Sequence, residues 1–127
     1  MSETQNQKLF ALRPEIVSDA SDSIQEQFQN ETLRPILKQQ NEVLLRTFRH
    51  YIIRHKNAFR ILSGKEQETY VRNAVRQDHN LRQFLKGIII GFFTESEWNI
   101  FIETEDELNK RLINLIEQRL ISQLKTI

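Results

Sequence analysis

The chain is 127 residues long, carries a formal net charge of +1, and contains three glycines, two prolines and no cysteine. That length suits one domain, and the lack of cysteine excludes disulfides, thiolate nucleophiles and cysteine-bound zinc or iron–sulfur centres. Because sheet proteins need many glycine- and proline-containing turns, the scarcity of both residues favours an all-α fold.

Residues 1–22 are predicted to form a flexible N-terminal arm, followed by a single helical domain over residues 23–127. The arm has one small apolar cluster, made of Leu9, Phe10 and Leu12. Pro14 interrupts regular structure, and the polar stretch 18–22 is typical of a linker. We expect the arm to stay loose unless a groove receives this cluster, because so little apolar surface does not offset the entropy lost on ordering.

The domain is predicted to be a compact bundle of four to six helices, because capping signals divide it at regular intervals. A Ser or Thr followed three residues later by Glu, the capping-box pattern, occurs at Ser23, Ser63, Thr94 and Thr104. Asp78 is a further cap. These signals predict helices over 64–77 and 79–93, a short helix after Thr94, and a last helix from Thr104 to Leu124 or beyond.

The clearest predicted element is one helix over residues 33–62, capped by Thr32, with Pro35 in its first turn. Its apolar stripe is about 100° wide and includes Phe48, Tyr51 and Phe59. His55 lies within that stripe, so we expect a hydrogen-bonded core histidine there.

The opposite face of this helix is basic, since residues 33–62 hold seven Lys or Arg and one acid. Its cations form a candidate face for an anionic partner: Lys38, Arg46, Arg49, Lys56 and Arg60. Such a face could attract nucleic-acid phosphates, or pair with acidic parts of the same chain. We expect no sequence-specific nucleic-acid binding, because the aromatic residues needed for stacking lie on the core-facing side.

The segment Gly87–Gly91 has small-xxx-small spacing and lies in the most apolar part of helix 79–93. We expect this part of the helix at the centre of the bundle, with Gly87 and Gly91 at a close crossing of two helices. The segment up to Phe93 is also the longest apolar run, and it is much shorter than the roughly 20 residues of a membrane span. No signal-peptide core precedes it, so we expect a cytoplasmic protein that does not cross a membrane.

The last predicted helix has an apolar side about 180° wide, more than one neighbouring helix covers. Arg119 and Gln123 interrupt this side, as polar residues do where an interface sets register or admits water. We therefore predict a homodimer. The residues expected at its interface are Leu112, Ile116, Arg119, Leu120, Gln123 and Leu124.

No catalytic, metal-binding or cofactor-binding motif was found. The three histidines lack the spacing of shared metal ligands, and no glycine-rich phosphate loop or serine-nucleophile motif is present. The acids 103–107 cluster at a helix start, where they favour the helix dipole. We therefore expect no cofactor, and an enzyme is the less favoured interpretation.

Four segments of the sequence are similar to a small family of uncharacterised proteins from Bacteroidetes-type bacteria. They are Leu33–Lys38, His55–Phe59, Leu85–Thr94 and Leu108–Arg111, and the resemblance spans about residues 25–127. It implies membership of an all-helical family and assigns no mechanism. Some members carry the label glyoxalase. Metal-dependent glyoxalases are built from βαβββ modules with His and Glu ligands, and the sequence predicts neither these strands nor this set of ligands.

The favoured hypothesis is a helical protein-interaction module with an acidic partner or a second copy of itself. Weak binding of nucleic-acid backbones through the basic face is the alternative. A small-molecule enzyme with Arg, His and Tyr in a pocket is the third hypothesis. An apolar groove would favour the interaction module, and a continuous positive strip would favour nucleic-acid binding. A deep pocket that holds His55 beside a carboxylate with a perturbed pKa would favour the enzyme.

Overall fold

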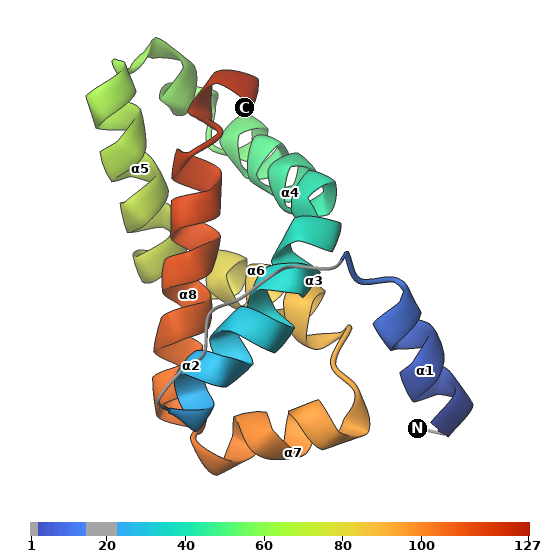
Figure 1. Ribbon diagram of the computed structural model, residues 1–127. Coiled ribbons are helices and arrows are strands. Elements are labelled where there is room, and N and C mark those ends of the chain that lie inside the picture. Colours follow the sequence, from blue (N-terminus) through green and yellow to red (C-terminus); the bar gives the residue numbers. More distant parts are fainter. Residues whose placement is uncertain (1–2, 15–22) are drawn as a thin grey trace.

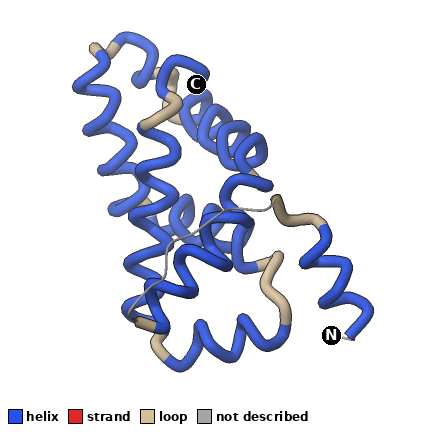
Figure 2. The backbone as a smooth tube through the Cα atoms, viewed as in Figure 1, coloured by secondary structure: helices blue, strands red, loops and turns tan. Residues whose placement is uncertain are grey.

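The computed structural model describes residues 3–14 and 23–127, which form helices and no strand (Figures 1 and 2). The α-helices are α1 (Glu3–Ala11), α2 (Ile24–Phe28), α3 (Arg34–Gln39), α4 (Asn41–Arg54), α5 (Gly64–Gln77), α6 (His79–Ile90), α7 (Glu95–Glu103) and α8 (Glu105–Ile121). A π-helical turn, η1 (Gln29–Leu33), and two 3₁₀ turns, η2 (Ala58–Ile61) and η3 (Leu124–Thr126), complete the described elements. The prediction of an all-α bundle is confirmed.

The capping signals place most helix starts correctly. Ser63 and Thr94 each form a complete capping box with the Glu three residues later, and Ser23 and Asp78 accept a hydrogen bond from the third amide of their helices. Thr104 precedes α8 without a side-chain cap bond. The helix begins there nonetheless, because burial of its apolar side outweighs the loss of one cap.

The predicted fresh start at Thr32 is wrong, because the helix continues through Pro35. Residues 24–39 run as α2, the π turn η1 and α3, with the Arg34 amide donating to the Gln29 carbonyl five residues earlier. Proline has no amide to donate, and a π turn accommodates the altered hydrogen-bond register. Thr32 is buried and donates to Glu97 at 3.0 Å instead of capping.

The single helix predicted over 33–62 is also wrong. The chain turns at Gln40 (φ −95°, ψ 14°), and α4 ends at Arg54. Lys56 and Asn57 then adopt positive φ angles of 62° and 56°, so no α-helix can continue there. His55 is exposed at the end of α4 and stacks on Tyr51 at 4.0 Å between ring centroids. It is therefore not a core histidine.

Helix α8 is the centre of the bundle, in contact with α5, α6, α7 and η1 (Figure 1). Its wide apolar side is buried against other helices of the same chain, and Leu112, Ile116 and Leu120 are at most 1 % exposed. Leu124 is half-buried against the same core. Leu112, Ile116 and Leu120 are therefore not available for the predicted dimer interface, because several neighbouring helices, not one, cover this side of α8. For Arg119, Gln123 and Leu124, which are half-buried, the interface stays a prediction.

Helix α6, predicted to be central, lies at the surface with only one face in the core. Gly87 and Gly91 are both exposed. A Cβ on Gly87 would meet nothing within 4 Å, and one on Gly91 would meet only the Gly87 carbonyl, at 3.1 Å. The predicted close helix crossing at these glycines is therefore wrong.

The predicted arm contains a helix, α1, which has no buried residue and lies to one side of the bundle (Figure 1). Arg13 follows it and enters the bundle, where its guanidinium donates to Glu97 at 2.5 and 2.6 Å and to the Phe92 carbonyl at 2.8 Å. Both charged side chains are less than 10 % exposed. The linker predicted over 18–22 lies outside the described residues.

Candidate anion-binding site

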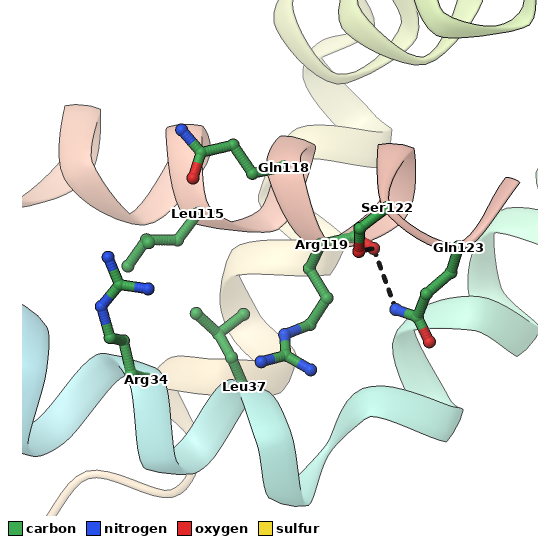
Figure 3. A pocket seen from close by; sticks show the side chains of 7 residues that line it. All are labelled: Arg34, Leu37, Leu115, Gln118, Arg119, Ser122 and Gln123. Atoms are coloured by element: carbon green, nitrogen blue, oxygen red, sulfur yellow. Dashed lines mark hydrogen bonds between the residues drawn. The ribbon is translucent and has the colours of Figure 1, made fainter. Parts of the chain in front are cut away.

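A polar cavity of about 250 Å³ lies between α3 and α8 (Figure 3). Arg34 projects into it from α3 and Arg119 from α8, with Leu37 between the two guanidinium groups in this view. The cavity, called the arginine cavity below, is lined by Arg34, Leu37, Leu115, Gln118, Arg119, Ser122 and Gln123. Side chains from two helices that lie far apart in sequence therefore converge on one space.

Arg119 is held in place by an amide network. Asn41 and Gln123 exchange two reciprocal side-chain hydrogen bonds of 2.8 Å each. The Asn41 carbonyl oxygen also accepts from Arg119 at 3.3 Å, and Gln123 donates to the Arg119 backbone carbonyl at 2.9 Å. Because both amides are anchored, the Arg119 guanidinium keeps one direction, towards the cavity.

The position of Arg34 is set by the π turn that precedes it. The turn ends at Leu33 and makes Arg34 the first residue of α3. Its Nε donates to the Asn30 side chain at 3.1 Å, which leaves the two terminal nitrogens of the guanidinium without a described partner. Those nitrogens are the donors that bind carboxylate or phosphate oxygens in pairs.

The arginine cavity has no negative charge among its described lining residues. Neither Arg34 nor Arg119 forms an ion pair with any carboxylate in residues 3–14 or 23–127. Burial lowers the pKa of Arg119, and the nearby positive charge of Arg34 lowers it further. An arginine remains protonated under such shifts, so the cavity holds two positive charges that an anion would stabilise.

The cavity can accommodate a single small oxyanion. Its floor is closed by Leu37 and Leu115, which are 1 % and 7 % exposed. Gln118 and Ser122, both exposed, add polar atoms at its mouth. The anchored Arg119 and the exposed Arg34, over an apolar floor, suit one carboxylate or phosphate group, and the space is too small for a large ligand.

The predicted basic face is not one strip. Arg46 and Arg49 share Glu42, at 3.3 and 3.4 Å. Arg49 also donates to the Thr126 carbonyl and Arg60 to the Ile127 carbonyl, so both are tied to the C-terminal segment.

The two remaining lysines of that predicted face are separated from each other. Lys56 lies in the turn after α4. Lys38 is exposed on α3, one helical turn after Arg34, and it is the only member of the predicted face beside the arginine cavity.

The sequence drew attention to two of the seven residues that line the arginine cavity, Arg119 and Gln123, although it predicted them at a dimer interface. It singled out Arg119 and Gln123 as polar interruptions of an apolar helix side, and both line the cavity. It missed Arg34, because the break at Gln40 and the π turn change which residues of 29–40 face α8. The only available signal was Pro35, whose missing amide forces an irregular turn immediately before α3.

Another cluster of charged side chains links two helices of the bundle. Glu117 is 4 % exposed and receives Arg76 at 2.9 Å and Arg72 at 3.2 Å, which joins α5 to α8. The described residues contain no group of three His, Asp or Glu side chains that could hold a metal ion. In the same part of the chain, no helix is both long and apolar enough to cross a membrane.

The chain was compared with family models, curated proteins and solved structures. No family model, no curated protein and no solved structure matches the chain.

Proposed function

We propose that this protein is a helical binding module that holds an acidic group of a partner protein between Arg34 and Arg119. The observation that carries the proposal is the pairing pattern of the arginines. Arg13, which is nearly fully buried, lies against the carboxylate of Glu97, and the buried carboxylate of Glu117 receives the exposed Arg72 and Arg76. The arginine cavity has two guanidiniums, an anchoring network and no described acid.

Magnitudes favour a protein partner over a free ion. Two charge-assisted hydrogen bonds contribute roughly 3–6 kcal/mol together, whereas association costs at least about 4 kcal/mol of lost freedom. The net gain is at best about 2 kcal/mol, so a lone phosphate or acetate should bind only at tens of millimolar or above. A partner protein that also contacts Gln118 and Ser122 at the mouth of the cavity would gain further affinity from the same binding event.

The proposal is tested by calorimetric titration with three probes at constant ionic strength: sodium acetate, sodium phosphate and a hexaglutamate peptide. We expect the peptide to bind about tenfold or more tightly than acetate, because several carboxylates share the surface. Arg119→Gln and Arg34→Gln should each weaken peptide binding about tenfold, the effect of losing one charge-assisted pair.

Arg46→Gln is the matched control, since Arg46 is exposed and lies on α4 outside the cavity. It should leave peptide affinity unchanged within about twofold, because surface ion pairs contribute little. Equal losses in Arg46→Gln and Arg119→Gln would mean that hexaglutamate responds to general positive charge, and the proposal would fail.

The nucleic-acid hypothesis loses its main premise, because the basic residues of 33–62 do not form a continuous strip. The homodimer stays a prediction, and it would need a surface other than the buried side of α8. The acidic-partner hypothesis keeps support, since Arg119 and Gln123 line a site of suitable charge.

A further inference from the structure

A second and larger cavity, of about 430 Å³, lies between α4 and α6. We call it the ring cavity, because four aromatic rings line it, those of His50, Tyr51, His55 and Phe84. Tyr51 and His55 come from α4, with ring centroids 4.0 Å apart, and Phe84 comes from α6. None of the arginine-cavity residues contributes to it.

Phe84 is the unusual member. It is 62 % exposed, whereas Leu81 and Leu85 on the same helix are 7 % and 0 % exposed. An exposed phenylalanine in the wall of a cavity contributes nothing to the core, and its π face suits a flat ring. The predicted basic face has no exposed aromatic ring for stacking, but Phe84 on α6 provides one.

Polar groups without partners surround this ring. Arg54, His50 and Asn80 line the ring cavity, are exposed, and have no side-chain hydrogen bond or ion pair within the described residues. Asp78 differs, because it caps α6 through the Leu81 amide at 3.1 Å and lies near Tyr51. Burial, together with the charge of Asp78 and the neighbouring Tyr70, raises the pKa of Tyr51 to about 12.

The free groups define a ligand chemistry. An amide and an imidazole can bind the hydrogen-bonding edge of a heterocycle, and a guanidinium can bind an anion. We infer that the ring cavity is a binding site for a planar heteroaromatic ring that carries an anionic group, stacked on Phe84 with its charge at Arg54. A nucleoside monophosphate is the simplest representative. Since Asp78 is occupied as a cap, the inference includes no catalytic step.

The test is titration of isotope-labelled protein, followed by NMR, with AMP, adenosine and inorganic phosphate at constant ionic strength. AMP should shift the His50 and Asn80 signals. Adenosine should bind about tenfold more weakly because it lacks the anion, and phosphate should leave these two signals unmoved. Absence of AMP binding, or equal shifts from phosphate alone, would overturn the inference.

Substitutions at Phe84 separate stacking from bulk. Base–aromatic stacking contributes about 1–3 kcal/mol, so Phe84→Leu should weaken AMP binding about tenfold. Phe84→Tyr keeps the ring and should retain the affinity within about twofold. Both should fold normally, because Phe84 is largely exposed. Full AMP affinity in Phe84→Leu would contradict the inference.

Arginine variants keep this inference separate from the proposed function. Arg54→Gln should weaken AMP binding without changing hexaglutamate binding, and Arg34→Gln combined with Arg119→Gln should do the reverse. If the double variant abolished AMP binding, the nucleotide would belong to the arginine cavity, and the ring cavity would lose its assignment.

Discussion

Arg13 and Arg119 are both drawn into the bundle, yet their surroundings differ. The guanidinium of Arg13 meets a buried carboxylate, a backbone carbonyl and an aromatic ring, with its carbon 4.7 Å from the centre of Phe10. Arg119 meets a neutral amide on one side and the charge of Arg34 near the other. Fold stability explains the first arrangement and not the second.

The comparison gives a physical criterion for separating structural from functional arginines. Removing a charge from water costs several kcal/mol unless a partner compensates. A half-buried guanidinium that has only neutral hydrogen-bond partners and another cation nearby is not compensated for its lost hydration. Binding of an anion would supply that compensation. Three of the following predictions break or sharpen this contrast, and the largest concerns the paired arginine; another concerns the surface of α6.

Glu97→Ala should lower the free energy of unfolding by about 3–5 kcal/mol, because it leaves Arg13 buried without its counter-charge. It also removes the acceptor of Thr32 and of the Thr94 amide. Urea denaturation measures the loss. Glu103→Ala, an exposed change on the same helix, should cost less than about 0.5 kcal/mol, and similar losses in both variants would contradict a buried ion pair.

Acid should remove the stabilisation that this ion pair provides. Burial by itself raises the pKa of Glu97, but hydrogen bonds from Arg13, Thr94 and Thr32 and the charge of Arg13 outweigh it, so the pKa falls below the usual 4.5. The stabilisation is therefore complete above pH 4.5 and is lost as the pH falls through the lower folded value.

The pH dependence is measured as the difference in unfolding free energy between the wild type and Glu97→Gln. We expect a constant difference at neutral pH that shrinks below pH 4.5, the usual value for this carboxyl. A difference that grows in acid would reverse the sign and show that burial dominates.

Gly87→Ala should stabilise the protein by roughly 0.5–1 kcal/mol, because alanine favours a helix over glycine by about that amount. The position has open space around a Cβ. Thermal unfolding gives the change. A destabilising result would show that this face of α6 packs against something close, such as a second copy of the chain.

Arg119→Met should leave stability unchanged or raise it by about 0.5 kcal/mol. The change removes repulsion from Arg34 and keeps an apolar stem of similar length, at the cost of one hydrogen bond to Asn41. Arg13→Met is the matched comparison, and it should destabilise because Glu97 loses its counter-charge. Equal losses in the two variants would remove the distinction between the arginines.

Local signals in the sequence account for most helix bounds. Ser63, Asp78 and Thr94 cap helices as predicted, since a cap depends on residues within one turn. The breaks at Gln40 and at Lys56–Asn57 were missed, because an apolar stripe at helical spacing continues across them. Tertiary packing of the flanking segments decides those breaks.

The candidate sites depend on contacts between distant segments, which one sequence does not reveal. Arg34 and Arg119 are brought together only by the π turn before α3 and the central position of α8. The part of helix 79–93 around Gly87 and Gly91 was expected at the centre of the bundle, because an apolar helix surface resembles a buried one until the neighbouring helices are placed. Arg119 and Gln123 were noticeable only as polar interruptions of an apolar side.

The most direct measurement is NMR of the arginine Nε–Hε groups during a phosphate titration at constant ionic strength. Arg34 and Arg119 should shift together with one common dissociation constant, while Arg46 and Arg72, each beside a carboxylate, stay unmoved. Arg119→Gln should abolish the shift of Arg34. Independent shifts of Arg34 and Arg119, or equal shifts at all four arginines, would show that no anion is held between them.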